Sequence, residues 1–403
     1  MHGRVFFCLV LSLWLGGCRA APIVIPGVVA PSDCPESSAV GDAVFLVGDA
    51  GKPKLPQDDA DTRLVDPLLR SLRSDVDAWV DRLGPEHVLV VFLGDNVYPR
   101  GLVPPGESAR AHGERVLEAQ IAAAGSARAI FTAGNHDWDM EGAKGWEHIR
   151  EQNAFLAARG ERVSMLPAGG CAGPERVDLG RRLRLVFIDP IGFSHAAEDP
   201  ARHAAACPQS NAVEAFLELA DEFDAPDGRH VVLALHHPLI TAGAHGGNFT
   251  WKQHVFPLTD FVPWLWLPLP VIGSAYPLSR QLGVTGTDAT SQQYDRWIRG
   301  IYRATRPRVP IVFAGGHEHS LQVHRDSVGT YYIVSGSGSK LSRVEPLETA
   351  MFSLSAPGYM RLDSHTDGAL GLSVISLLDG ETPEQVFRHC LAEGPPEPRK
   401  RRR

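Results

Sequence analysis

Side chains of the kinds that bind metal ions follow apolar runs at five places in the chain, each beside a glycine or a histidine. Carboxylate, phenolate and amide oxygens suit hard, highly charged cations, and imidazole nitrogen suits iron, zinc and manganese. The set is large enough for two metal ions: Asp49, Asp95, Tyr98, Asn135, His236, His317 and His319. Two neighbouring ions need a shared ligand, and the Asp95 carboxylate is the best candidate for that bridge. The pattern predicts a hydrolase with a dinuclear metal centre.

The apolar runs that lead into these residues predict an α/β fold. We expect strands at residues 43–47, 87–93, 129–132, 183–188, 231–235, 309–314 and 331–334, and five of these seven run into a candidate ligand. Apolar residues at helical spacing predict a helix over 65–83. Glycines precede Asp49, Asp95, Asn135 and His317, and they allow a sharp turn, with positive φ if needed, as each strand ends. Since open α/β sheets place sites at the carboxyl ends of strands, the ligands should meet at one sheet edge.

The five short sequences around these residues resemble the motifs of the metallophosphoesterases, and within them those of the purple acid phosphatases. That branch has the pattern GDxG, GDxxY, GNH(D/E), VxxH and GHxH. Here the sequences are GDAG at 48–51, GDNVY at 94–98, GNHD at 134–137, LALH at 233–236 and GHEH at 316–319. Leu233 replaces a valine, which is a mild change. Most metallophosphoesterases begin Asp-x-His instead, whereas position 51 is glycine here and Tyr98 is an added candidate ligand.

The resemblance implies two packed mixed β-sheets flanked by helices, the four-layer sandwich of the metallophosphoesterases. It implies Fe(III) held by Asp49, Asp95, Tyr98 and His319, and a divalent Fe, Zn or Mn ion held by Asp95, Asn135, His236 and His317. A charge count agrees with a trivalent ion. Two divalent ions, two aspartates and one hydroxide leave about one positive charge, which a tyrosinate would cancel unless one ion is trivalent.

The likeness to the small, animal-type purple acid phosphatases covers most of residues 43–385. Residues 236–246 align with an HYPVWSIAEHG-like segment, which places His245 on the histidine beside the substrate in those enzymes. The implied activity is hydrolysis of phosphate monoesters by a metal-bound hydroxide, with His136 and His245 positioning the ester and assisting the leaving oxygen. His237 is interpreted as a structural residue that points away from the metals. A phosphodiesterase or nucleotidase is an alternative, and a metal-containing binding or redox lipoprotein with vestigial hydrolysis is the alternative of another class.

The N-terminal residues resemble an export signal. Arg4 precedes an apolar run, residues 5–15, that is too short to span a bilayer as a helix. The sequence LGGC at 15–18 resembles a bacterial lipobox, which implies cleavage before Cys18, its lipidation, and a membrane-anchored protein in the periplasm or at the cell surface. A plain signal peptide is the alternative. Both interpretations place the protein outside the cytoplasm.

We expect a signal peptide at 1–17, a proline-containing tether at 18–40, one metallophosphoesterase catalytic domain at 41–390 and a basic tail at 391–403. The 403 residues are 44% hydrophobic, which is ample for one large core. The net charge of -8 disfavours non-specific nucleic-acid binding. Four cysteines other than those of the signal permit two disulfides in any of three pairings, with Cys171–Cys207 favoured: Cys34, Cys171, Cys207 and Cys390.

An apolar, proline-rich insertion at 249–283 lies outside the resemblance. Five prolines within residues 255–278 exclude a membrane-spanning helix, because the freed backbone groups would have no partners in lipid. Two interpretations stay open: a buried loop or packing surface, and an aromatic lid or interfacial loop that dips into the bilayer beside the active site. The basic run at 399–403 is either a solvated tail or a contact with an anionic surface.

Overall fold

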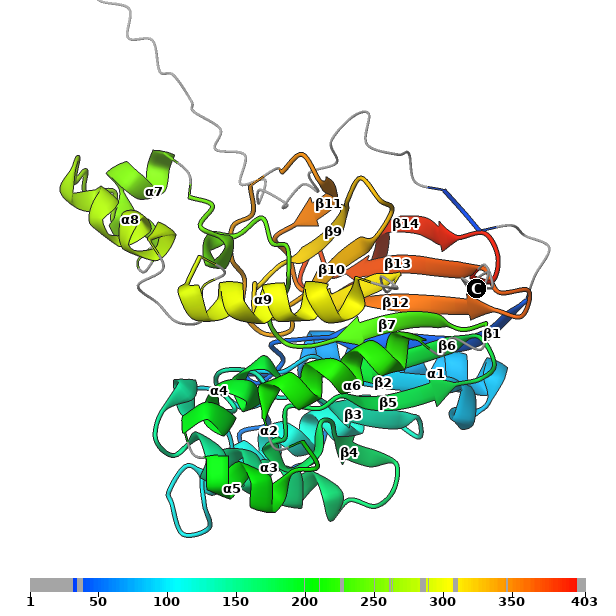
Figure 1. The fold of residues 1–403 in the computed structure, drawn as a ribbon. Coiled ribbons are helices and arrows are strands. Elements are labelled where there is room, and N and C mark those ends of the chain that lie inside the picture. Colours follow the sequence, from blue (N-terminus) through cyan, green and yellow to red (C-terminus); the bar gives the residue numbers. More distant parts are fainter. Residues whose placement is uncertain are drawn as a thin grey trace, which may run out of the picture.

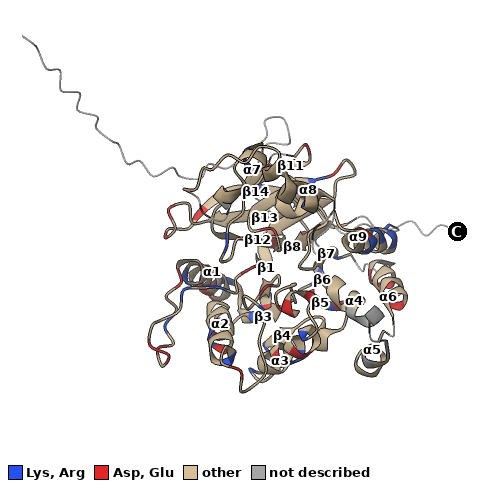
Figure 2. Cartoon of the chain, turned by 90° about the vertical axis from the view of Figure 1, so that its left-hand side faces the viewer, with Lys and Arg blue, Asp and Glu red and all other residues tan. Residues whose placement is uncertain are grey.

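Two seven-stranded mixed sheets pack face to face, and helices cover both outer faces (Figures 1 and 2). The computed structural model describes residues 32–34, 39–198, 200–209, 211–224, 228–249, 251–260, 262, 264–282, 288, 290–306, 311–345 and 347–396. The observed layers are helices, sheet, sheet and helices, so the predicted four-layer α/β sandwich is confirmed.

The first sheet has the order β14-β13-β12-β1-β2-β3-β4. Its strands are β1 (Val40–Val47), β2 (Val88–Phe92), β3 (Arg128–Phe131), β4 (Val163–Met165), β12 (Gly358–His365), β13 (Leu370–Ser376) and β14 (Glu384–Ala392). Its outer face packs against α1 (Pro67–Leu83), α2 (Arg110–Ala123) and α3 (Gly145–Ala157) in one apolar cluster. The helix α1 begins where the Asp66 side chain accepts the Leu69 N–H at 3.1 Å, and ends at Gly84 with φ 92°.

The second sheet has the order β11-β9-β10-β8-β7-β6-β5. Its strands are β5 (Glu175–Leu179), β6 (Leu183–Phe187), β7 (His230–Ala234), β8 (Val312–Gly315), β9 (Leu321–Arg325), β10 (Tyr331–Ser335) and β11 (Ala350–Leu354). Two helices pack on its outer face: α6 (Ala212–Asp224) and α9 (Gln292–Thr305). Two shorter helices, α4 (Pro190–Glu198) and α5 (Pro200–Ala206), follow β6. The inner faces of the two sheets share a separate apolar core.

All seven predicted strands are present, with ends shifted by a few residues, as β1, β2, β3, β6, β7, β8 and β10. The predicted helix is α1. Strands β1 to β3 are parallel to one another, as are β6, β7 and β8. Their carboxyl ends therefore reach one edge of each sheet.

The segment just before β1 is held to the last strand. Cys34 forms a disulfide with Cys390 of β14, and Asp33 forms an ion pair with Arg388 at 3.1 Å. The prediction of a tether up to residue 40 is therefore wrong for residues 32–34, because this short stretch is docked on β14. The favoured second disulfide, Cys171–Cys207, is confirmed. Residues 1–31 and the basic run at 399–403 lie outside the described residues, so the signal, the lipidation of Cys18 and the tail stay predictions.

The insertion projects from the body of the molecule as two short helices with connecting turns, α7 (Trp251–Val255) and α8 (Ala275–Gln281) (Figure 1). Large apolar side chains of this segment are exposed: Trp251, Trp264, Trp266, Leu267, Val271, Ile272, Leu278 and Leu282. The interpretation of a buried loop or packing surface is therefore wrong for these side chains. Within the described residues, no helix is both long and apolar enough to cross a bilayer.

Candidate metal centre and substrate pocket

The carboxyl ends of the central strands of both sheets meet at one place. Gly48 N–H donates to Ser335 O at 2.6 Å, which joins the end of β1 to the end of β10. Asp49 N–H donates to Gly94 O at 2.9 Å, which joins the loops after β1 and β2. All seven predicted metal ligands come together there, in two groups that share one residue.

The first group surrounds the phenol oxygen of Tyr98. Tyr98 Oη lies 3.0 Å from Asp49 Oδ1 and 3.0 Å from Asp95 Oδ2. His319 Nε2 lies 3.4 Å from Tyr98 Oη and 3.4 Å from Asp49 Oδ1. Donor atoms of Asp49, Asp95 and His319 all lie within 4.8 Å of one another, which is close enough to hold one ion.

The second group surrounds the amide oxygen of Asn135. Asn135 Oδ1 lies 3.2 Å from His236 Nε2 and 3.0 Å from His317 Nδ1. The two imidazole nitrogens are 3.3 Å apart. Asp95 Oδ1 lies 3.4 Å from His236 Nε2, while its other oxygen faces Tyr98. Asp95 is thus placed between the two groups, where a bridging ligand is needed.

Hydrogen bonds outside the two groups orient the ligand atoms. His236 Nδ1–H donates to Leu93 O at 2.7 Å, which leaves Nε2 for a metal ion. The backbone N–H of His317 donates to Asp49 Oδ2 at 2.8 Å, and Ser342 Oγ lies 3.3 Å from His319 Nδ1. The ring orientations are therefore set by the protein itself.

The backbone turns at the ligands rather than mainly at the glycines before them. Asp49, Asp95 and His317 have φ of 58°, 56° and 65°, and of the four preceding glycines only Gly94 has positive φ. Of the four glycines at which the sequence allows positive φ if needed, the structure uses it at Gly94 alone. Gly134 is required instead by close packing, since a Cβ there would lie 2.3 Å from Asp95 Oδ1. A Cβ on Gly94 would lie 2.6 Å from His236 Nδ1.

The chemistry of the cluster fits cations. Asp49 and Asp95 are 0% and 1% exposed, and among the described residues their ion-pair partners are histidines. Burial, together with the charges of Asp49 and Asp95, raises the pKa of Tyr98 well above its usual value. Two buried carboxylates beside a phenol need positive charge nearby, and a bound cation also favours ionisation of that phenol.

A cavity of about 230 Å³ opens over both groups. Its walls include Asp95, Asn135, His136, Met140, His245, Tyr276, Arg280, His317 and His319. His136 donates Nδ1–H to Pro99 O at 2.6 Å, and its Nε2 lies 3.8 Å from Asp95 Oδ2. Both predicted substrate-side histidines, His136 and His245, therefore line the cavity beside the candidate ligands.

Two carboxylates hold His245, and neither was predicted. His245 lies in a short turn, Ala244–Gly246, whose backbone N–H at His245 donates to Glu318 Oε2 at 3.0 Å. Its ring Nδ1 lies 3.0 Å from Asp288 Oδ1 and 2.8 Å from Arg280 Nη2. Arg280 is the only charged residue in the stretch 261–282, and that isolation is a signal by which it could have been found.

Another carboxylate absent from the sequence prediction joins two ligand loops. Asp137 accepts N–H groups of Gly134 at 2.8 Å and of Asn96 at 3.0 Å, and it is fully buried. It therefore holds the loop of Asn135 against the loop of Asp95. His237 packs its buried ring against Tyr294 and Trp297, and also against the candidate ligand His317, with ring centres 4.5 Å apart. Burial lowers the pKa of His237 well below its usual value, so the ring is neutral.

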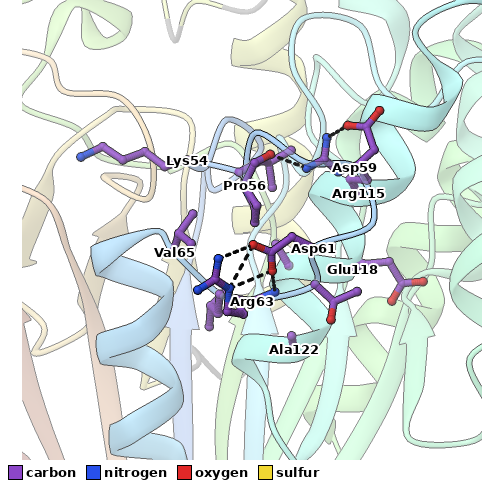
Figure 3. A pocket seen from close by; sticks show the side chains of 13 residues that line it. Lys54, Pro56, Asp59, Asp61, Arg63, Val65, Arg115, Glu118 and Ala122 are labelled. Atoms are coloured by element: carbon purple, nitrogen blue, oxygen red, sulfur yellow. Dashed lines mark hydrogen bonds and ion pairs between the residues drawn. The ribbon is translucent and has the colours of Figure 1, made fainter.

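A second cavity, of about 340 Å³, lies beside α2 (Figure 3). Two ion pairs lie in its wall: Arg63 Nη2 donates to Asp61 Oδ2 at 2.6 Å, and Arg115 pairs with Asp59. Arg115 also donates to Pro56 O at 2.6 Å. None of the predicted ligands lines this cavity, so the chemistry of the motifs belongs to the first one.

Solved structures of other proteins share the fold of this chain. The GAP50 structure, the anchor in the inner membrane complex of Plasmodium, is 13% identical over 88% of this chain and 89% of that one, with a TM-score of 0.51. The PhoD structure is 10% identical over 90% and 72%, with a TM-score of 0.51. Purple acid phosphatase PPD1 from yellow lupin (Lupinus luteus) is 14% identical over 89% and 55%, with a TM-score of 0.48. At such identities the likenesses to GAP50 and PhoD concern the fold alone.

No curated protein sequence matches the chain. The model of the family described as calcineurin-like phosphoesterase matches residues 70–321, which is more than half of the 403 residues. This span contains every candidate ligand except Asp49, which lies before it. By its sequence match and its fold, the chain belongs to the calcineurin-like phosphoesterase family.

Proposed function

We propose that this phosphoesterase is a phosphatase of the purple acid phosphatase branch, which hydrolyses phosphate monoesters at a dinuclear centre. The observation that carries the proposal is the position of Tyr98, whose Oη lies 3.0 Å from both Asp49 and Asp95. A phenol oxygen between two buried carboxylates is a suitable ligand for a trivalent ion such as Fe(III).

The residues divide between two ions. Asp49, Tyr98 and His319 would hold Fe(III), Asn135, His236 and His317 would hold a divalent Fe, Zn or Mn ion, and Asp95 would bridge them. When bound, the two cations would withdraw charge from the phosphoryl oxygens and lower the pKa of water enough to supply the nucleophile.

The side chains around the cavity would bind and orient the ester. His136 is fixed by its bond to Pro99 O and stands beside Tyr98, with the two rings 4.4 Å apart. His245 stands over His317, with ring centres 4.0 Å apart. These two imidazoles therefore flank the ligand cluster, where they can hold the phosphoryl group and donate a hydrogen bond to the leaving oxygen.

The test combines metal analysis, a visible spectrum and kinetics on purified protein. We expect about two metal ions per chain, at least one of them iron, and a visible absorption band that the Tyr98→Phe change abolishes. We also expect faster hydrolysis of p-nitrophenyl phosphate than of bis(p-nitrophenyl) phosphate. A colourless, iron-free protein with unchanged activity after Tyr98→Phe would overturn the proposal.

Three alternative functions give other outcomes when nucleoside monophosphates are added to the same experiment. A phosphodiesterase would favour the bis-ester, and a nucleotidase would favour nucleoside monophosphates over p-nitrophenyl phosphate. A binding or redox lipoprotein would contain the metals and hydrolyse none of these esters. The cavity favours hydrolysis, because it opens directly onto the candidate ligands Asp95, Asn135 and His317.

We further propose that the protein is exported, anchored by lipid at Cys18, and touches the bilayer with its insertion. Support comes from the exposed side chains of Trp264 at 77%, Trp266 at 53%, Val271 at 87% and Ile272 at 74%. Arg280 is the one charged residue in the stretch 261–282. Tryptophan and aliphatic side chains without charge are typical of segments that lie at the membrane interface.

Vesicles of brominated lipids would test this contact, because bromine quenches tryptophan fluorescence only at close range. We expect quenching that the triple change Trp251→Phe, Trp264→Phe, Trp266→Phe largely removes, while the control Trp79→Phe on α1 retains it. Equal quenching in all three proteins, or none in the wild type, would reject the bilayer contact. Dimer formation in the absence of lipid would point to a second copy of the chain instead.

A further inference from the structure

Three side chains from separate parts of the chain form a compact group at the wall of the substrate cavity. Asp288 accepts Arg280 Nε–H at 2.8 Å and is also bound by Arg280 Nη2. His245 Nδ1 lies 3.0 Å from Asp288 Oδ1. The side chain of Asp288 is 0% exposed, that of Arg280 11% and that of His245 22%. His245 is the most exposed of the three side chains, whereas Asp288 has no exposed surface.

We propose that Asp288 and Arg280 are positioning residues that hold the His245 imidazole in one orientation toward the ester. This inference rests on the proposed phosphatase function. His245 Nδ1 lies between Asp288 Oδ1, which can only accept a hydrogen bond, and Arg280 Nη2 at 2.8 Å, which can only donate one, so this pair occupies Nδ1 in either tautomer. The nitrogen that remains for the substrate is then Nε2.

Arg280 keeps the carboxylate of Asp288 in place. Its Nε and Nη2 form a two-point contact with that carboxylate, and its Nη1 donates to Tyr276 Oη at 3.1 Å. A buried carboxylate needs such a partner, because an unpaired charge would be strongly destabilised. Asp288 is thereby fixed as a rigid acceptor for the His245 ring.

The backbone of His245 is fixed independently of its ring. Its N–H donates to Glu318 Oε2 at 3.0 Å, and Gly243 lies against the same carboxylate, since a Cβ there would be 2.0 Å from Glu318 Cδ. With the backbone held by Glu318 and Nδ1 held by Asp288, little freedom remains for the ring to turn. Such pre-organisation matters, because small displacements of a reacting group can cost a large factor in rate.

The insertion is thus part of the active site. Arg280 belongs to α8, and both Arg280 and Tyr276 line the cavity with the candidate ligands. The segment that interrupts the family resemblance therefore supports one of the residues that the resemblance predicts to act on the substrate.

The experiment compares Asp288→Ala and Arg280→Gln with wild type on two esters, phenyl phosphate with a poor leaving group and p-nitrophenyl phosphate with a good one. We expect kcat to fall about 10-fold or more on phenyl phosphate, and much less on p-nitrophenyl phosphate, with little change in KM. The Asp288→Asn variant keeps an acceptor oxygen, so it should recover part of the loss. The matched control is the exposed Arg299–Asp295 pair of α9, where Asp295→Ala and Arg299→Gln should leave both rates unchanged.

A double-mutant cycle separates positioning from general damage. If Asp288 acts through His245, the Asp288→Ala change should have little further effect in a His245→Ala background. Additive losses, or equal losses on both esters, would overturn the inference, and so would an active Asp288→Ala variant with wild-type kcat. Metal content and melting temperature identify a variant that has simply misfolded, in which case Asp288→Asn decides. A wild type that hydrolyses neither ester would overturn the proposed function, and this inference with it.

Discussion

The ammonium nitrogen of Lys340 lies 3.3 Å from the centre of the Tyr98 ring. A cation over the face of an aromatic ring is attracted by its electrons, and the attraction is greater when the ring carries negative charge. Lys340 follows β10 in the second sheet, whereas Tyr98 follows β2 in the first. This contact across the sheets would therefore stabilise Tyr98 in its ionised form when a metal ion is bound.

The first prediction concerns colour. If Tyr98 is an iron ligand, Lys340→Met should move the visible absorption band of the iron-loaded protein to longer wavelength. The reason is that removal of the cation raises the energy of the phenolate electrons, so that less energy transfers one to Fe(III). The control Lys52→Met changes an exposed lysine and should leave the band in place. An unchanged band in Lys340→Met would show that this lysine does not influence the phenolate.

The second prediction concerns metal content. Asp95 lies between the two groups, so Asp95→Ala should reduce binding at both sites, whereas Asn135→Ala should affect mainly the divalent site. Elemental analysis should then give about two ions for wild type, about one for Asn135→Ala and fewer than one for Asp95→Ala. Retention of a full ion in Asp95→Ala would argue against a bridging role.

The third prediction concerns stability and pH. Asp189 follows β6, and its buried carboxylate accepts Trp138 Nε1–H at 2.7 Å and Ile191 N–H at 2.9 Å. Burial raises the pKa of Asp189 to about 7. A raised pKa means that the native state favours the protonated acid. The stabilisation from this group is therefore complete below the unfolded pKa near 4, and it is lost as the pH rises through about 7.

Replacement by a neutral amide removes that dependence. From pH 5 to pH 8, the unfolding free energy of wild type should decrease by about 2–3 kcal/mol more than that of Asp189→Asn. Urea titrations at the two pH values measure the difference. Asp221→Asn on the exposed side of α6 is the control and should follow wild type. Parallel behaviour of all three proteins would mean that Asp189 ionises normally.

The fourth prediction concerns the two disulfides. Cys34 and Cys390 are 356 residues apart, against 36 for Cys171 and Cys207. Because a longer closed loop restricts the unfolded chain more, Cys34→Ser with Cys390→Ser should cost more than Cys171→Ser with Cys207→Ser, within a range of about 2–5 kcal/mol. Chemical denaturation of the two double variants measures this. A smaller loss for the first pair would show that residues 32–34 unfold separately from the sheets.

The sequence predicts the candidate metal centre well because strands that lead into it are buried along their whole length. Strands such as β2 and β7 are buried along their whole length, so they appear as continuous apolar runs that end abruptly at a ligand. In β14, by contrast, buried and exposed positions are mixed, so its sequence contains no continuous apolar run. Among the strands missing from the prediction, β5 and β14 are of this second kind and β4 is very short. Strands β9, β11, β12 and β13 are almost fully buried, but polar residues or glycines interrupt their apolar residues, as in LGLSVIS of β13.

Patterns of apolar residues do not predict contacts between segments that lie far apart in the sequence. Nothing in the residues around His245 indicates that Asp288, 43 positions later, holds its ring. The positive φ of Asp49 and Asp95 is equally hidden, because the sequence places a glycine beside each of them and so suggests that the glycine makes the turn. Motif order predicts which residues meet, while the tertiary structure decides how each is held.

The bond between Cys34 and Cys390 sets where any N-terminal anchor would pull on the molecule. The covalent junction lies on β14, at the opposite end of the molecule from α7 and α8 in Figure 1. A force exerted through a lipid at Cys18 would therefore act on the sheet at β14 rather than at the start of β1. A molecule that is anchored at β14 and contacts the bilayer with its apolar insertion would lie flat along the membrane. The distance between the substrate cavity and the lipid would then depend on the insertion rather than on the length of the N-terminal segment that carries the lipid.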